Sequence, residues 1–118
     1  MLIGYSFGAD VIPFAWPLLS ADLQDRTKVL ALLAPSLSTS FQVTISGWLG
    51  IDDSDRRIAP AIAALPKDKV TCIYGKDDAD ETACTDPAIA KSTVIETDGG
   101  HHFDGDYTTI AQRFLDRL

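Results

Sequence analysis

The chain has 118 residues, 46% of them hydrophobic and 23% charged, which is enough apolar material for the core of one globular domain. This composition excludes disordered, collagen-like and coiled-coil chains, and no apolar run approaches the roughly 20 residues that a membrane-spanning helix needs. The net charge is −7, and the 10 basic residues are scattered along a sequence that also holds 17 acidic ones. We therefore expect no nucleic-acid partner, and we interpret the acidic surface as serving solubility.

Strands and helices are predicted to alternate along the chain. Apolar runs predict strands at residues 1–5, 28–34, 70–74 and 93–96, and the alternating pattern at 41–47 predicts an antiparallel or peripheral strand. Helical segments are expected at residues 7–19, 20–25, 57–65 and 107–118. Pro13 and Pro17 should kink or restart the first of these, while Ser20 and Asp106 are suited to cap the second and the last. The alternation indicates an α/β fold with a doubly wound, mostly parallel sheet and flanking helices.

The first strand runs directly into Gly4-Tyr5-Ser6-Phe7-Gly8, which has the G-x-S-x-G pattern of a nucleophile elbow. In such a turn the strand ends, the backbone reverses sharply into a helix, and the serine hydroxyl is left exposed at the tip. We expect both glycines to be required, because a side chain at either position would collide with the neighbouring strand or helix. A structural alternative is that Ser6 simply caps the helix that follows it.

A catalytic serine needs a base, and the sequence offers two adjacent candidates. A serine hydroxyl is a weak nucleophile at neutral pH, and an imidazole suits the removal of its proton during attack. The only histidines are His101 and His102, placed after two glycines that permit a tight turn beyond the last predicted strand. We predict that His101 is the base for Ser6, with His102 as the alternate that otherwise packs or hydrogen-bonds locally.

The third element of a triad is a carboxylate that orients the histidine and stabilises the imidazolium. An acidic cluster follows the strand at residues 70–74, and within it we favour Asp78, then Asp80, then Asp77. Most of such a run is expected to be a solvated loop. The resulting order of serine, acid and histidine is the chain order of α/β-hydrolases. Asp10, one turn beyond the serine, is interpreted as a residue that favours the positive end of the helix dipole.

The position of the serine near the N-terminus predicts an incomplete hydrolase domain. A nucleophile elbow normally follows several βα units, so residues 1–118 are expected to form a single, partial domain that corresponds to the C-terminal half of the fold. The backbone N–H of Phe7 supplies one predicted oxyanion donor, but the second normally comes from an earlier loop. The first strand should also lie at a sheet edge, where either further sequence or a second protomer would cover it.

Two cysteines bracket the acidic loop. Cys72 lies in the third apolar strand and Cys84 lies just beyond the carboxylates. A disulfide between them would close a short loop, hold the acid in place and imply an oxidising compartment. The alternative is a pair of reduced thiols. The spacing does not suit a zinc site, and no metal or cofactor is expected.

Four segments together resemble a known family more specifically than the serine motif alone. They are LIGYSFGADVIPFAW, ISGWLG, CIYGKDDADETAC and GGHHFDGDY, and the resemblance extends over nearly the whole chain. The chain is similar to the bacterial virulence protein VirJ and the related AcvB C-terminal domain. This resemblance implies a periplasmic α/β-hydrolase-type domain in which Ser6 is the nucleophile, with Asp78 or Asp80 and His101 or His102 as partners.

The resemblance also implies substrates and partners. AcvB-like members are associated with hydrolysis of lysyl-phosphatidylglycerol, and VirJ is associated with type IV secretion of virulence substrates. We therefore predict a serine esterase that acts on an aminoacylated lipid or a small ester. A non-catalytic periplasmic module that binds secretion substrates is the alternative, because fold does not fix function. A homo-oligomer formed through the exposed first strand is a further expectation.

Overall fold

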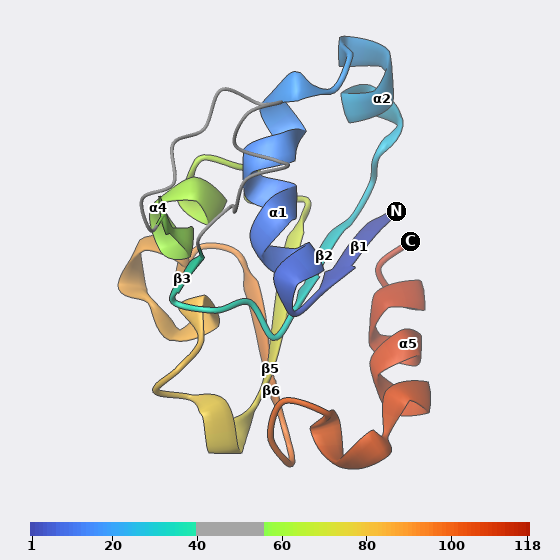
Figure 1. The fold of residues 1–118 in the computed structure, drawn as a ribbon. Helices are drawn as coiled ribbons and strands as arrows, with labels where there is room; N and C mark the ends of the chain where they lie inside the picture. Colours follow the sequence, from blue (N-terminus) through green and yellow to red (C-terminus); the bar gives the residue numbers. More distant parts are fainter. Residues whose placement is uncertain (40–55) are drawn as a thin grey trace.

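A computed structural model describes residues 1–39 and 56–118, and its centre is a parallel four-stranded sheet. The strands lie in the order β1-β2-β5-β6, so their order in the sheet follows their order in the chain (Figure 1). Their bounds are Leu2–Tyr5, Leu30–Leu33, Val70–Gly75 and Thr93–Thr97. The predicted α/β class with a parallel sheet is confirmed, and β1 lies at the expected edge. The strand predicted at residues 41–47 falls outside the described residues.

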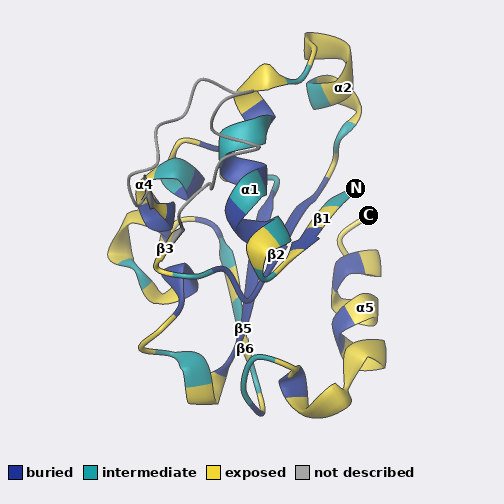
Figure 2. Ribbon diagram, in the orientation of Figure 1, coloured by how far each residue is buried: buried dark blue, intermediate teal, exposed yellow. Residues whose placement is uncertain are grey.

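Helices cover both faces of this sheet, which makes the fold doubly wound. The helices are α1 (Phe7–Ala15), α2 (Ala21–Arg26), α4 (Ile58–Ala63) and α5 (Tyr107–Leu115). Helices α1 and α4 pack with Leu30 and Leu32 of β2 on one face, and α5 packs with Ala31 and Leu33 on the other. Because successive strand residues point to opposite faces, a strand buried on both faces must be a continuous apolar run. The buried residues accordingly concentrate in the central strands and on the inner sides of the helices (Figure 2).

Short elements complete the connections between the main strands and helices. Single turns of 3₁₀ helix lie at Trp16–Leu18, Lys76–Asp78, Ala83–Thr85, Pro87–Ile89 and Phe103–Gly105. A two-stranded antiparallel pair joins β3 (Ser38–Thr39) to β4 (Arg56–Arg57). Within the described ranges, no helix combines the length and the apolar character needed to cross a membrane.

The two predicted N-caps are confirmed, and helices α4 and α5 end earlier than predicted, as does the first helix. Ser20 caps α2 by accepting a hydrogen bond from the Leu23 N–H at 3.3 Å, and Asp106 caps α5 by accepting one from the Thr109 N–H at 3.3 Å. The expected restart at Pro13 does not occur, because α1 continues to Ala15 before the chain tightens into the turn that contains Pro17. Pro13 is itself buried, and burial of this apolar side of the helix offsets the missing backbone hydrogen bond.

The two cysteines form a disulfide, which confirms the predicted bridge. It links Cys72 of β5 to Cys84 in the turn Ala83–Thr85, across 12 positions of sequence. Both residues are buried in the core on the α1 and α4 side of the sheet. Closing a loop of this length stabilises the folded chain by about 3 kcal/mol in the chain-entropy model. The bridge encloses the whole acidic cluster.

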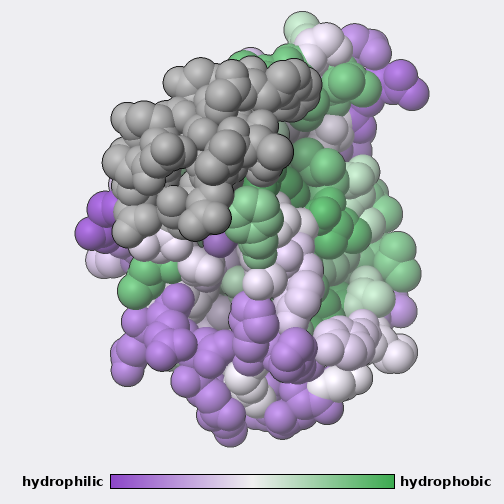
Figure 3. All heavy atoms as spheres, viewed as in Figure 1, coloured by the Kyte–Doolittle hydropathy of each residue, from purple (hydrophilic) through white to green (hydrophobic). Residues whose placement is uncertain are grey.

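On the face drawn in Figure 3, hydrophilic and hydrophobic residues gather in different places. Hydrophilic residues gather where the loops after β5 and β6 lie, and hydrophobic residues gather beside α1 and β1 (Figure 3). Met1, Ile3, Tyr5 and Phe7, all in or next to β1, are between 39% and 52% exposed. The edge strand therefore presents apolar side chains as well as an open backbone edge.

The two glycines of the serine motif have different roles. A Cβ placed on Gly4 would press against the Gly8 carbonyl and lie 2.7 Å from the Ala9 nitrogen. A Cβ on Gly8 would meet nothing within 4 Å. The expectation that both glycines avoid collisions is therefore right for Gly4 and wrong for Gly8, because Gly8 lies on an open side of α1.

We expect Gly4→Ala to lower the free energy of unfolding by about 1–3 kcal/mol or more, because backbone atoms must move to admit the methyl group. Gly8→Ala is the matched control, and it should be neutral or add about 0.5–1 kcal/mol, since alanine is the better helix former. Urea denaturation of both variants measures the difference. Equal stabilities would contradict the close approach of β1 and α1.

Candidate active site

Ser6 occupies a strained turn between β1 and α1. Its backbone angles are φ 55° and ψ −119°, a region that non-glycine residues rarely enter. The Ser6 N–H donates to the Leu33 carbonyl at 2.9 Å, and the Ser6 carbonyl accepts from the N–H groups of Ala9 and Asp10 at 3.0 and 3.2 Å. These bonds tie the residue to β2 on one side and to the first turn of α1 on the other. Such a conformation costs on the order of 1–3 kcal/mol, and it persists because both neighbours hold it.

The Ser6 side chain points to His101 rather than to its own helix. It makes no capping hydrogen bond to α1, so the capping interpretation fails. Its Oγ lies 2.9 Å from the Nε2 atom of His101. For Nε2 to accept the hydroxyl proton, the neutral imidazole must carry its hydrogen on Nδ1. That nitrogen faces Asp78, whose Oδ2 lies 3.9 Å away.

Asp78 is the acid that the fold brings to the histidine. It ends the turn Lys76–Asp78 directly after β5, while His101 follows β6, so the two side chains meet because adjacent parallel strands end at the same edge. The distance of 3.9 Å is an ion-pair distance, longer than a hydrogen bond. Catalytic hydrogen bonds are often long before substrate binds and tighten in the complex. Among the described residues, neither Asp77 nor Asp80 forms an ion pair with a histidine.

The loops that carry Asp78 and His101 are joined through their backbones. A Cβ on Gly75 would lie 2.9 Å from the Gly100 carbonyl carbon, so the strand end can approach this closely only as glycine. The Asp77 N–H donates to the Gly99 carbonyl at 3.0 Å, and Gly99 has a φ of 84° that favours glycine. Gly99 and Gly100 therefore allow the loop that carries the histidines to pack against the turn Lys76–Asp78.

His102 occupies a different position from His101. Its Nδ1 lies 2.9 Å from the Tyr5 hydroxyl oxygen, and the Tyr5 hydroxyl also donates to the His101 carbonyl at 2.9 Å. Within the described part of the chain, Ser6 Oγ has a hydrogen-bond contact with His101 and none with His102. The geometry therefore favours His101 over the alternate as the partner of the serine. Phe7, the first residue of α1, places its backbone N–H next to the serine, and its role as oxyanion donor stays a prediction.

A small cavity lies beside His101 and Asp78, and Ser6 is not among the described residues that line it. It has a volume of about 220 Å³ and is lined by residues from the loop after β2, the end of β5, the acidic loop and the histidine loop. They are Ala34, Pro35, Ser36, Tyr74, Asp78, Glu81, Thr82 and His101. Two of these eight side chains are carboxylates beside the histidine. The cavity offers room for a small polar group next to His101.

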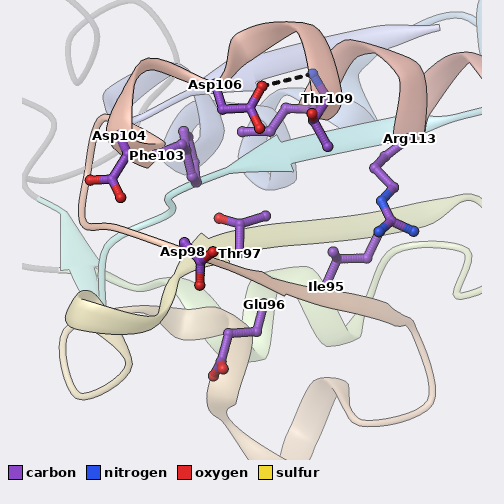
Figure 4. Close-up of a pocket in the computed structure, with 10 residues that line it drawn as sticks. Ile95, Glu96, Thr97, Asp98, Phe103, Asp104, Asp106, Thr109 and Arg113 are labelled. Carbon is purple, nitrogen blue, oxygen red and sulfur yellow. Dashed lines mark hydrogen bonds between the residues drawn. The ribbon is translucent and has the colours of Figure 1, made fainter.

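A larger cavity, of about 380 Å³, lies elsewhere, between β6 and α5 (Figure 4). Arg113 reaches across it from α5 toward Ile95, and Asp106, which caps α5, lies at its edge. It contains none of the three triad candidates. We therefore associate the candidate active site with the smaller cavity, which His101 and Asp78 line. Within the described ranges, no three His, Cys, Asp or Glu side chains are grouped to hold a metal ion.

Asp10 makes more contacts than its predicted role at the helix dipole requires. Its side chain is only 3% exposed, and its Oδ1 accepts a hydrogen bond from the Ser36 N–H at 2.8 Å. Ser36 in turn pairs with Thr82, whose hydroxyl donates to the Pro35 carbonyl at 2.9 Å. Asp10 therefore connects the serine helix to the loop after β2 and, through that loop, to the acidic loop. A polar residue one turn after the serine, on the same helix face, was the available signal.

A family model described as "Bacterial virulence protein (VirJ)" matches residues 1–118 of the chain. No curated protein and no solved structure matches it.

Burial raises the pKa of Asp10 above its ordinary value, against the opposing effects of the hydrogen bonds from Ser36 and the charge of His101. The folded protein therefore holds this proton more tightly than the unfolded chain, in which the pKa is about 3.9. The resulting stabilisation is complete below that value and is lost as the pH rises through the folded-state pKa.

We expect the stability of the wild type relative to Asp10→Asn to fall as the pH is raised from about 4 toward neutral, because the amide keeps an acceptor for Ser36 but cannot ionise. Urea denaturation at intervals across this range gives the difference. Asp22→Asn, at an exposed position of α2, is the control and should show no comparable trend. A difference for Asp10→Asn that stays constant or rises with pH would contradict the buried environment of this carboxyl group.

Proposed function

The chain belongs to the VirJ family of bacterial virulence proteins, and on that premise we propose that it is a serine hydrolase that cleaves ester bonds. Ser6 is the nucleophile, His101 the general base and Asp78 the carboxylate that orients the base. The observation that carries this proposal is the distance of 2.9 Å between Ser6 Oγ and His101 Nε2. A serine held in a strained turn and aimed at an imidazole has no evident structural use, since its side chain does not cap the helix.

The proposed reaction begins with attack of Ser6 Oγ on the ester carbonyl carbon. His101 Nε2 takes the hydroxyl proton as the new carbon–oxygen bond forms, and the carbonyl oxygen becomes an oxyanion. Asp78 stabilises the imidazolium through the hydrogen on Nδ1. In this proposal the Phe7 N–H, at the start of α1, and the positive end of the α1 dipole stabilise the oxyanion.

Collapse of the intermediate expels the alcohol, which receives the proton from His101, and leaves an acyl group on Ser6. Water then attacks the acyl carbon with His101 again as base, and release of the acid restores the serine hydroxyl. A second oxyanion donor is not identified among the described residues. One missing donor of this kind costs on the order of 10²–10³ in rate, so low turnover by this chain would be compatible with the proposal.

For the substrate we propose an aminoacyl ester, with lysyl-phosphatidylglycerol as the specific candidate. Support comes from the family resemblance and from the carboxylates of Asp78 and Glu81 in the cavity beside His101, which suit a cationic aminoacyl group. The buried Cys72–Cys84 disulfide supports a location in an oxidising compartment, and we propose the periplasm.

The second candidate function is a binding module that holds virulence substrate proteins without turnover. It is favoured by one observation, the row of exposed apolar side chains along the edge strand β1, where another chain could add a strand. A second copy of this protein could use the same edge to form a homo-oligomer. Ser6→Ala separates the candidates, because binding through β1 should survive this substitution.

We predict that a fluorophosphonate probe labels the wild type at one site, seen as a single mass increase of the intact protein, and that Ser6→Ala abolishes labelling. His101→Ala should slow labelling by about 10²-fold or more, because the general base is lost. Asp78→Asn should slow it as well, whereas Asp80→Asn, at an exposed position in the same loop, should not.

Labelling of Ser6→Ala, or no labelling of a folded wild type, would contradict the hydrolase proposal. Loss of labelling in Asp80→Asn but not in Asp78→Asn would show that Asp80, and not Asp78, is the carboxylate that orients His101. Near-ultraviolet circular dichroism of each variant confirms that the comparison is between folded proteins.

We also predict that wild-type protein releases free lysine from vesicles that contain lysyl-phosphatidylglycerol, while Ser6→Ala does not. The expected reason is cleavage of the aminoacyl ester by the Ser6–His101 pair. Both products, lysine and phosphatidylglycerol, are quantified by mass spectrometry, and we expect them in equal molar amounts. A wild type that takes the probe but releases no lysine would reject this substrate and keep the hydrolase.

A further inference from the structure

Tyr5, the residue before Ser6, makes two hydrogen-bond contacts. Only one placement of the hydrogen atoms satisfies both of them. The Tyr5 hydroxyl oxygen lies 2.9 Å from the His101 carbonyl and 2.9 Å from His102 Nδ1. A phenol has one proton to donate, and a carbonyl oxygen can only accept. The proton must therefore go to the His101 carbonyl, and His102 Nδ1 must carry its own hydrogen and donate it to the phenol oxygen.

The Tyr5 ring also packs against the same loop. Its centroid lies 5.3 Å from that of His101, 6.3 Å from that of His102 and 6.3 Å from that of Phe103, in tilted arrangements. Such contacts between aromatic rings add to the hydrogen bonds in fixing a geometry. Desolvation, with smaller effects of Tyr107 and Asp78, raises the pKa of Tyr5, so the hydroxyl keeps the proton that it donates.

The histidine loop needs such support in addition to the acid. His101 Nδ1 lies 3.9 Å from Asp78, which is too long for a hydrogen bond to orient the ring by itself. The Tyr5 hydroxyl instead holds the backbone of the same residue whose ring faces the serine. Because Tyr5 and Ser6 are consecutive, any shift of the elbow moves nucleophile and support together.

We propose that Tyr5 and His102 are positioning residues that clamp the His101 backbone at hydrogen-bond distance from Ser6. The clamp consists of the His102 Nδ1–H donating to the Tyr5 hydroxyl, which donates to the His101 carbonyl. It gives the second histidine a role that is distinct from proton transfer. The inference rests on the proposed function for its effect on rate, but the hydrogen arrangement stands on the contacts alone.

The experiment combines the labelling rate with the ¹⁵N NMR spectrum of the histidine rings. In the wild type we expect the signals of His102 to show hydrogen on Nδ1, and in Tyr5→Phe we expect that preference to disappear. The rate of labelling by the fluorophosphonate should fall about fivefold to tenfold in Tyr5→Phe, the loss expected for one hydrogen bond. Tyr107→Phe is the matched control, because its hydroxyl makes no hydrogen bond to a described residue and its ring is exposed.

His102 provides a second test that does not depend on the aromatic ring of Tyr5. An asparagine amide can donate from nearly the position of Nδ1, so His102→Asn should retain more of the labelling rate than His102→Leu. A purely structural effect would not separate His102→Asn from His102→Leu, and it would not alter the tautomer of the His102 ring. Unfolding measurements show whether each variant is folded at the assay temperature.

The outcomes separate the clamp from the hydrolase proposal. A wild type that labels while Tyr5→Phe labels at the same rate would overturn the clamp and leave the hydrolase intact. A wild type that does not label would reject the hydrolase, and the clamp would then be judged by NMR alone. In that case His102 with hydrogen on Nε2 instead of Nδ1 would overturn it, and hydrogen on Nδ1 that is lost in Tyr5→Phe would support it.

Discussion

The arrangement of the site depends on the turn at Ser6. This turn holds Ser6 at backbone angles that residues other than glycine rarely adopt. The backbone bonds to Leu33 on one side and to the start of α1 on the other leave the serine no alternative position. With the backbone so fixed, the direction of the Ser6 Cα–Cβ bond is set, and the contact of Oγ with His101 Nε2 at 2.9 Å shows where the hydroxyl points. Gly4 permits this turn because the helix passes directly over it.

From this turn, polar contacts extend in two directions and join loops that are far apart in the sequence. On one side Asp10 holds the loop after β2 through Ser36, and that loop pairs with Thr82. On the other side Tyr5 reaches the histidine loop. The carboxyl ends of all four main strands are therefore connected through residues within one helical turn of Ser6. This arrangement favours a site that is formed before substrate arrives.

The fold and the three triad candidates could be predicted because each depends on local pattern and on one rule of parallel sheets. Continuous apolar runs mark buried strands, and polar residues that follow neighbouring strands meet at one edge. Asp10 was assigned only to the helix dipole, because its burial depends on where the loop after β2 returns, which no local pattern records. The roles of Gly4 and Gly8 could not be separated for the same reason. Likewise, the contacts of Tyr5 depend on where the histidine loop comes to lie.

The disulfide has a consequence for the order in which the site can be assembled when the chain folds under oxidising conditions. Its two cysteines are 12 residues apart, and everything that the bridge encloses precedes β6 and the histidine loop. The acid loop can therefore be covalently closed while the segment that carries the base has yet to join the sheet. If the bridge closes first, the pairing of Ser6 with His101 is the last of these steps. Ser6 and His101 then meet only after the acid loop has been fixed.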